Sequence, residues 1–380
     1  KSKSFTYQSE IWADKAGYYA YLPAAFKFDF NSNNFPDSID VKTGNGFVLN
    51  NENGKVITKY TCGVALMQSP FFLLADILAE PLGFERNGFS KIYHSSVNVA
   101  SVCYLVLGLF FLFKFLSIRF GNKSTLFAIL SLFFATNLYY YSIDETGMSH
   151  IYSFSLFCIF LHFIQSTNYL KKSSYLISLL FGLLAGLIIL IRPTNILFLS
   201  TFLFLDANDI KDVGDRVKRI FNLKGLIPIV IGVLFIISPQ LLYWNYLSGS
   251  FVSYSYENEG FNWLDPKLLY TWFSPNNGLF LYTPFYILIV GALSLMIKNK
   301  KANGVFILIL FMVISYVFSS WWMWSFGCSF GSRSYVEYLS LFSIPIAYLI
   351  NKVGKMKSLS ITIFVNAAIH QLNKLVVMAG

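Results

Sequence analysis

Long apolar runs separated by short polar connections make up most of this chain. Each run can be judged against the roughly 20 residues that a helix needs to cross a bilayer. The pattern predicts an all-α polytopic membrane protein with a bundle of about ten or eleven transmembrane helices. The predicted spans cover residues 96–117, 124–142, 147–166, 174–191, 194–205, 226–246, 279–297, 304–320, 335–351 and 358–378. Of these, the run at 194–205 is short and the last is interrupted by polar residues.

The first part of the chain, residues 1–95, has a different pattern. It is rich in Asn, Gly, Asp and aromatic residues up to about residue 60, and it carries turn signals such as Asn53-Gly54. Residues 61–80 are apolar but broken by Gln, Pro and Asp, which favours a helix lying in the membrane interface. We therefore predict an outward-facing cap at 1–95, followed by a transmembrane helical domain at 96–380.

Charge assigns the two sides of the membrane. Lys and Arg total 29 against 19 Asp and Glu, a formal net charge of +10, while only 13% of residues are charged and 55% are hydrophobic. Every second connection between apolar runs is basic, which places those connections in the cytoplasm. The same pattern explains the net charge without a nucleic-acid partner. The remaining connections, expected to face outward with the cap, are 142–147, 191–194, 247–278 and 320–335.

The outward connections gather most of the ionisable and aromatic side chains that could carry chemistry. A transporter usually hides its ionisable residues in mid-membrane, whereas here they lie at helix ends on one face. This arrangement favours an enzyme acting on a substrate whose tail stays in the bilayer. The residues concerned are Asp14, Asp144, Glu145, His150, Arg192, Tyr256, Glu257, Glu259, Asp265, Trp321, Trp322, Trp324 and Arg333.

Three segments together resemble the GT-C superfamily of membrane glycosyltransferases. Residues 12–23 (Trp-Ala-Asp-Lys-Ala-Gly-Tyr-Tyr-Ala-Tyr-Leu-Pro) look like the first outer loop with its acid. Residues 273–284 and 321–335 are similar to loop-to-helix entries of bacterial members. The order of features is closest to the bacterial branch related to protein O-mannosyltransferases and aminoarabinose transferases. In that superfamily the loop follows a first membrane helix, so one is expected before residue 1.

The resemblance implies transfer of a sugar from a polyprenyl-phosphate-linked donor to a lipid, glycan or protein acceptor, with inversion at the anomeric carbon. It also implies a multi-pass protein of the bacterial inner membrane with its active site on the periplasmic side. The chain departs from better-known members because Lys15, not a second acid, follows Asp14, and no pair of metal ligands is evident. A metal cofactor is therefore left open and no metal ligand is assigned.

Two acids are the predicted catalytic residues. Asp14 would act as the base that takes a proton from the acceptor hydroxyl, against the alternative of a solvated loop acid. Glu145 would face the site while its neighbour Asp144 caps the following helix.

Arg333 and Arg192 are the predicted ligands of the donor phosphate, since a guanidinium can bind phosphate oxygens through two parallel hydrogen bonds. The alternative for both is snorkelling to the lipid headgroups. Further substrate contacts are predicted at residues that could equally be structural or belong to an interfacial aromatic belt: Tyr18, Tyr19, His150, Tyr256, Glu257 and Trp324.

Other readings stay open. A flippase or transporter of lipid-linked glycans, or a polymerase or ligase of surface polysaccharide, could use the same lipid, and a noncatalytic scaffold is a third class. Cys62 and Cys328 both fall in outward segments, where a disulfide would be allowed, although their spacing does not require one.

Overall fold

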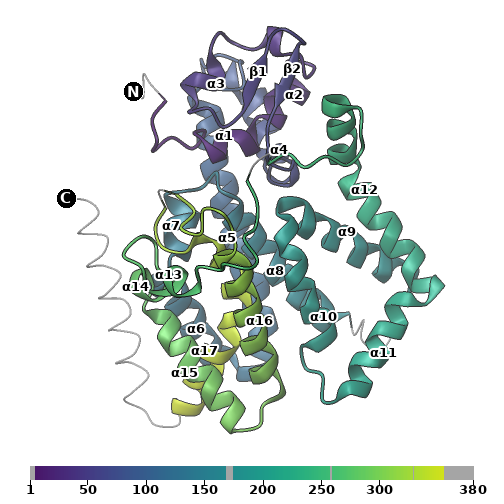
Figure 1. Ribbon diagram of the computed structural model, residues 1–380, viewed down its shortest axis with the longest axis vertical. Coiled ribbons are helices and arrows are strands. Elements are labelled where there is room, and N and C mark those ends of the chain that lie inside the picture. The colour runs from purple at the N-terminus through teal and green to yellow at the C-terminus, as the bar shows by residue number, and fades with distance from the viewer. Residues whose placement is uncertain (1–4, 168–173, 257–258, 328, 355–380) are drawn as a thin grey trace.

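The structure is a computed structural model, and it describes residues 5–167, 174–256, 259–327 and 329–354. In these ranges the chain is mostly helical, with one small two-stranded sheet. A small lobe at one end sits on a bundle of longer helices (Figure 1). The all-helical class predicted from the apolar runs is thus confirmed in its main feature.

The outer lobe, residues 5–62, is built from short elements and carries the only sheet of the described chain. Strands β1 and β2 pair antiparallel, with Val48 opposite Ile57. Their turn contains the predicted Asn53-Gly54 signal, and Gly54 has a φ of +71°, which glycine adopts without steric penalty. The elements are α1 (Asp14–Tyr19), α2 (Tyr21–Phe26), η1 (Ser32–Asn34), α3 (Ile39–Lys42), β1 (Val48–Asn50) and β2 (Lys55–Ile57).

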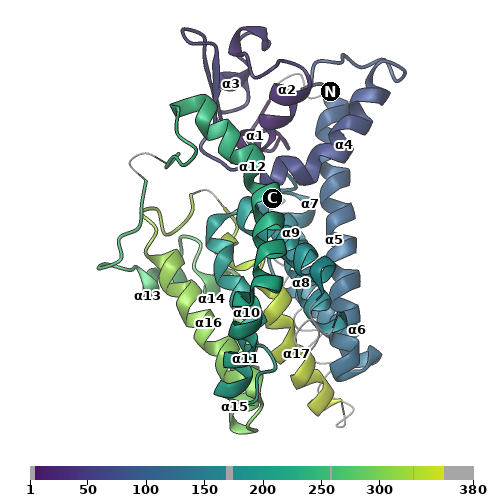
Figure 2. The ribbon, with the colours of Figure 1, turned by 90° about the vertical axis from the view of Figure 1, so that its right-hand side faces the viewer.

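The bundle below the lobe begins with α4 and ends with α17. Helix α5 packs along α8 and against α4, α12 runs along α9, and α17 lies against α6 and α15; Figure 2 shows these helices from a second side. The elements are α4 (Gly63–Ala79), α5 (Lys91–Phe120), α6 (Asn122–Ala135), α7 (Leu138–Ile143), α8 (Ser149–Ser166), α9 (Tyr175–Ile191), η2 (Pro193–Leu199), α10 (Ser200–Phe204), α11 (Ile210–Phe221), α12 (Leu223–Ser248), α13 (Leu268–Phe273), α14 (Leu279–Tyr282), α15 (Phe285–Lys298), α16 (Ala302–Ser319), η3 (Arg333–Tyr335) and α17 (Leu339–Val353).

Local residues explain where three of these helices start or end. Ser174 accepts a hydrogen bond from the backbone of Ile177 at the start of α9, and Asp209 does the same for Asp212 at the start of α11. Helix α12 ends at Gly249, whose φ of +75° is typical of a helix C-terminus.

Two separate groups of buried side chains stabilise the molecule. The larger group lies mainly among the bundle helices, from α4 to α17, and includes Tyr18 and Tyr60 of the lobe. The smaller group joins the outer lobe to the bundle: Tyr19 and Phe47 of the lobe share it with Phe72 of α4, Tyr93 of α5 and Tyr243 of α12. The lobe is therefore fixed on the helices by shared hydrophobic burial and is not a flexible appendage.

Three helices of the described chain are long and apolar enough to cross a membrane: α5, α12 and α16. The predicted count of ten or eleven spans is not supported. The physical reason is that several apolar runs do not form one continuous helix. The run 124–142 breaks at Thr136 between α6 and α7, 279–297 breaks at Pro284 between α14 and α15, and 194–205 is a 3₁₀ segment followed by a five-residue helix. The predicted span at 358–378 lies outside the described residues.

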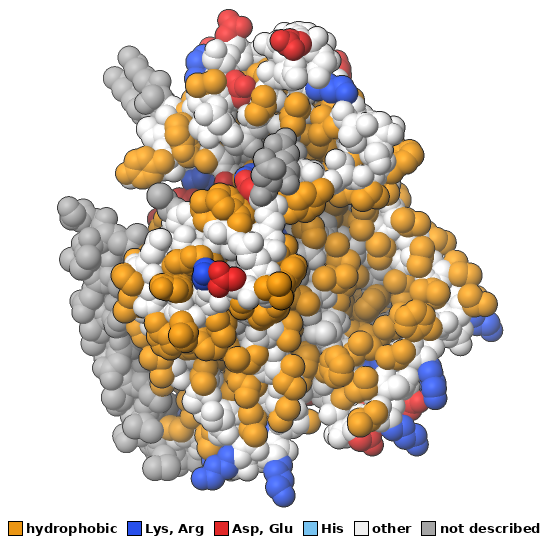
Figure 3. All heavy atoms as spheres, viewed as in Figure 1, with side chains coloured by type: hydrophobic (Ala, Val, Ile, Leu, Met, Phe, Trp, Pro, Cys, Tyr) orange, Lys and Arg blue, Asp and Glu red, His pale blue; other side chains and the backbone are white. Residues whose placement is uncertain are grey.

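The surface agrees with a chain that lies in a membrane. Hydrophobic side chains cover the flank of the bundle in the view of Figure 3, while Lys and Arg side chains gather at the end opposite the lobe. Exposed apolar residues of the bundle include Phe235 of α12 and Ile309 of α16, which are 70% and 58% exposed. In water such a surface would be costly. The predicted helix at 61–80 is α4, which packs on α5, α9 and the lobe.

Candidate functional site

A cavity of about 1610 Å³ lies where the outer lobe meets the helices. Its walls come from α1 and the β2–α4 connection in the lobe, from the starts of α8 and η2, and from the loops around residues 253–261 and 321–333. Segments far apart in the sequence thus meet at one place. Side chains on its wall include Trp12, Asp14, Lys15, Tyr18, Lys59, Tyr60, Glu145, His150, Arg192, Tyr256, Glu259, Trp321 and Arg333.

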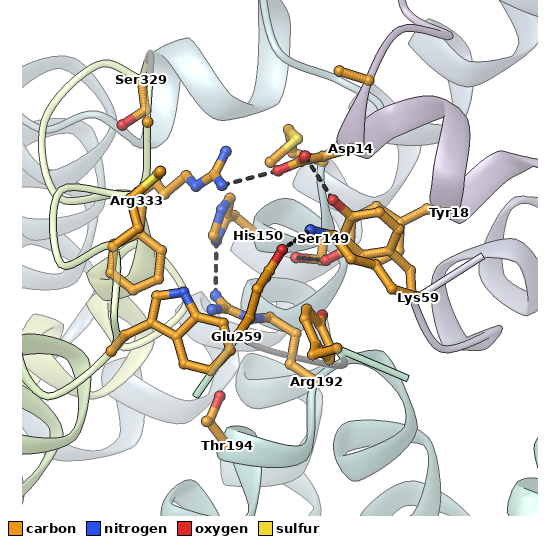
Figure 4. Close-up of a pocket in the computed structure, with 18 of the residues that line it drawn as sticks. Asp14, Tyr18, Lys59, Ser149, His150, Arg192, Thr194, Glu259, Ser329 and Arg333 are labelled. Atoms are coloured by element: carbon orange, nitrogen blue, oxygen red, sulfur yellow. Dashed lines mark hydrogen bonds and ion pairs between the residues drawn. The ribbon is translucent and has the colours of Figure 1, made fainter. Parts of the chain in front are cut away.

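Asp14 lies at the first position of α1 with both carboxylate oxygens engaged. Oδ1 accepts a hydrogen bond of 2.6 Å from the hydroxyl of Tyr60, and Oδ2 pairs with Nη2 of Arg333 at 2.9 Å (Figure 4). The turn before it is tight, because Ala13 has a φ of +47° and a Cβ on Gly46 would lie 1.8 Å from the Ala13 carbonyl oxygen. Only glycine at 46 lets the chain hold Asp14 in this position.

Asp14 and Arg333 each shift the pKa of the other. Burial raises the pKa of the Asp14 carboxyl, but the Arg333 guanidinium and the Tyr60 hydroxyl outweigh it, so this pKa lies below its usual range. Burial lowers the pKa of Arg333, and Asp14 raises it by more, so the guanidinium keeps its proton. Burial, and then the charge of Asp14, raise the pKa of Tyr60. The pair is therefore ionic, and Tyr60 is a neutral donor to it.

A second cluster on the same cavity joins α8, the α9–η2 junction and the chain just before α17. Nη1 of Arg192 donates to Oε1 of Glu337 at 2.9 Å, and Nδ1 of His150 lies 3.0 Å from Oε2 of the same carboxylate. Arg192 and His150 line the cavity, whereas Glu337 is completely buried behind them. A weaker contact of 3.4 Å joins Arg192 to the hydroxyl of Ser334.

Two further ion pairs lie on the cavity wall. Nζ of Lys15, a residue only 4% exposed, lies 2.9 Å from Oε2 of Glu145. Nζ of Lys59 pairs at 2.6 Å with Glu259, which bridges the lobe and the loop after α12. Asp14, Glu337, Glu145 and Glu259 thus each face a cation, and an anionic ligand that binds one of these cations would compete with its acid.

Aromatic rings form a continuous wall beside these charges. The Tyr18 and Tyr60 rings lie 4.4 Å apart, Tyr60 meets Tyr256 edge-on at 6.3 Å, and Tyr256 meets Trp321 edge-on at 5.7 Å. Rings in this arrangement can pack against the apolar face of a sugar or against a hydrocarbon chain.

The structure brings most of the residues predicted for the site onto this cavity. Seven of the ten predicted residues lie there: Asp14, Glu145, Arg333, Arg192, Tyr18, His150 and Tyr256. No second acid follows Asp14 closely in the sequence, but Glu145 contacts its neighbour Lys15 across the fold.

Two predicted substrate contacts lie elsewhere, and a third cannot be placed. Tyr19 is buried in the lobe, where its hydroxyl donates to the carbonyl of Gly88 and its ring packs on Phe72. Trp324 packs on Tyr270 and is not part of the cavity wall. These positions argue against substrate contact by either residue. Glu257 lies outside the described residues, as does Cys328, the proposed partner of the buried Cys62.

Sequence reasoning missed Tyr60, Lys59 and Glu337. Tyr60 and Lys59 lie in a polar stretch that carries no special spacing. Glu337 did carry a signal, because it is a lone acid at the start of the apolar run 335–351, and an ionisable residue in such a run needs a partner.

In the described part of the chain, no three His, Cys, Asp or Glu side chains come together as metal ligands. Comparisons with protein-family models, curated proteins and solved structures found no match to this chain. Function is therefore inferred from the cavity itself.

Proposed function

We propose that this protein is a membrane glycosyltransferase of the GT-C type that moves a sugar from a polyprenyl-phosphate-linked donor to a lipid, glycan or protein acceptor. The single observation that carries the proposal is the Asp14–Arg333 pair on the wall of a large cavity, at the junction of the outer lobe and the apolar helices. A donor with a lipid tail and a charged head needs a polar cavity for the head and an apolar surface for the tail.

Asp14 is the proposed base, and Arg333 with Arg192 the proposed phosphate ligands. When the donor phosphate draws Arg333 away, Asp14 loses the cation that most lowers its pKa. The carboxylate therefore becomes a stronger base once the donor is bound. The acceptor oxygen would bond to the anomeric carbon as the bond to the phosphate oxygen breaks. The electron pair leaves with the phosphate, where a guanidinium stabilises the added charge.

The apolar flank and the lobe fit the proposed location. The lobe and cavity would face the periplasm of a bacterial inner membrane, and the helix ends rich in Lys and Arg would face the cytoplasm. The hydrophobic flank of the bundle would hold membrane lipid and the polyprenyl chain.

The test is sugar transfer by purified protein in nanodiscs, supplied with a panel of polyprenyl-phosphate sugars and membrane extract. We expect Asp14→Asn to lower turnover by about 10²-fold or more, the usual contribution of a general base. Asp37→Asn is the matched control, since Asp37 is an exposed acid of the same lobe and does not line the cavity. Equal turnover by wild type and Asp14→Asn would remove Asp14 from the chemistry, and movement of lipid across the bilayer without sugar transfer would favour a flippase.

A further inference from the structure

Glu337 occupies an unusual position for a carboxylate. It is fully buried, it does not reach the cavity, and its two oxygens are divided between two side chains that do, Arg192 and His150. Burying a charge is unfavourable unless it is paired and hydrogen-bonded. This acid therefore holds two cavity side chains in place from behind.

The pairing also fixes which nitrogen of His150 carries the proton. A carboxylate paired with the guanidinium of Arg192 accepts hydrogen bonds and donates none. Nη1 of Arg192, which can only donate, also lies 3.5 Å from Nδ1 of His150, at the outer limit of a hydrogen bond. The closer contact, 3.0 Å between Nδ1 and Oε2 of Glu337, therefore favours the proton on Nδ1. In a neutral imidazole the other nitrogen, Nε2, is then a bare acceptor.

Nε2 of His150 is buried and has no hydrogen-bond partner within the described residues. Buried polar atoms are nearly always satisfied by protein, water or ligand. His150 lines the cavity, and Figure 4 shows its ring between the guanidinium groups of Arg333 and Arg192. The ring that carries this acceptor therefore lies beside the two residues assigned to the donor phosphate.

We propose that Glu337 is a positioning residue: it fixes Arg192 toward the donor phosphate and holds His150 in the Nδ1–H form, so that Nε2 accepts a hydrogen bond from a hydroxyl of the transferred sugar. The ligand half of this inference rests on the proposed function, whereas the orientation of His150 does not. A site that binds a hydroxyl in this way rejects analogues lacking it, because a buried acceptor is then left unpaired.

The test is nitrogen NMR of the full chain in detergent with ¹⁵N-labelled histidine. The chain has only four histidines, so the spectrum is simple, and His150→Gln identifies the signal of residue 150. At a pH of ~8.5, about two units above the ordinary histidine pKa, we expect His150 to show a protonated Nδ1 and an unprotonated Nε2. Wild-type protein with the proton on Nε2 would overturn the proposal, and this measurement needs no variant.

Glu337→Gln sharpens the test. We expect this variant to weaken the preference for a proton on Nδ1, so that a large part of the His150 signal shows the Nε2–H form. Glu10→Gln should leave the His150 signal unchanged. Glu10 is the matched control because it contacts Nδ1 of His94 at 2.9 Å, away from the cavity. An unchanged His150 signal in well-folded Glu337→Gln would contradict the positioning role.

The ligand half is tested by adding lipids to the same labelled protein. A polyprenyl-phosphate sugar should shift the Nε2 signal in the direction of an accepted hydrogen bond, whereas polyprenyl phosphate without a sugar should not. An equal shift with the sugar-free lipid would mean that Nε2 meets the phosphate and would overturn the hydroxyl assignment. If no lipid of the panel binds while the Nδ1–H form is observed, the proposed function fails and the positioning by Glu337 stands.

Discussion

Two histidine–carboxylate pairs of almost identical length lie in different parts of this molecule. Nδ1 of His94 is 2.9 Å from Glu10, where the outer lobe meets α5, and Nδ1 of His150 is 3.0 Å from Glu337, behind the cavity. The first pair is partly open to solvent, with side-chain exposures of 14% and 27%, and the second is closed, at 2% and 0%. The contact itself therefore does not distinguish the two sites; burial and the remaining partners do.

The remaining partners give each pair its role. The second oxygen of Glu10 accepts a hydrogen bond from the side-chain amide of Asn98, and the amide oxygen of Asn98 accepts one from the hydroxyl of Thr146. These hydrogen bonds connect the lobe to α5 and to the chain just before α8. The second oxygen of Glu337 accepts from a cation on the cavity wall. The same chemistry is thus used once to hold two parts together and once to orient groups toward a ligand.

Removing each carboxylate should give the largest difference between the pairs. We expect Glu337→Ala to lower the free energy of unfolding by about 3–5 kcal/mol, because it removes the buried member of an ion pair and leaves Arg192, 18% exposed, without that partner. Glu10→Ala should lower it by about 1–2 kcal/mol, the loss of partly solvated hydrogen bonds. Denaturant unfolding in detergent measures both, with the exposed Glu52→Ala as control. Equal losses for Glu337 and Glu10 would mean that burial does not separate the pairs.

Acid should act on the lobe pair in a predictable direction. The hydrogen bond from His94 lowers the pKa of Glu10 to about 2 from an ordinary value of 4.5. A depressed carboxyl pKa stabilises the fold above the ordinary value, and that stabilisation is lost as pH falls toward the folded-state pKa. Between pH 4.5 and about 2, the Tm of wild type should therefore fall more steeply than that of Glu10→Gln. Parallel curves from thermal unfolding at a series of pH values would count against this coupling.

The smallest effect is expected where an ion pair is half exposed. Lys59 and Glu259 keep 37% and 27% of their side chains exposed, and such pairs contribute about 0–1 kcal/mol. Lys59→Met should leave stability nearly unchanged but speed proteolysis of the loop after α12, which this pair fastens to the lobe. Lys267→Met is the control, since the Lys267–Asp265 pair lies within that loop. Equal proteolysis of both variants would show that the bridge does not hold the loop.

The sequence predicted the helical class and several of the charged residues on the cavity wall for a simple physical reason. Asp14, Arg192 and Arg333 all lie at polar breaks on one side of the apolar runs, and helix ends on one face of a bundle converge. The same pattern does not show which of two neighbouring residues reaches the cavity. Tyr18 and Tyr19 are consecutive on a helix, so their side chains point about 100° apart, and one reaches the cavity while the other enters the lobe core.

Helix breaks and burial were harder to predict. A run such as 279–297 reads as one span by composition, yet Pro284 divides it into α14 and α15. An acid at a helix start usually caps the helix or faces solvent, so the sequence alone does not show that Glu337 is paired inside the fold. Only the fold shows that Arg192 and His150 converge on it from α9 and α8.

The contact between Asp14 and Arg333 joins residues 319 positions apart, and this has a consequence for biosynthesis. The lobe leaves the ribosome with a bare carboxylate long before its cation is translated. Until η3 and α17 take their places, the cavity also lacks the acid that Arg192 and His150 require. The cavity is therefore completed only after residues 333–337 take their places, and a protein cut short before residue 333 would carry the lobe and the helices up to α16 without Arg333 and Glu337.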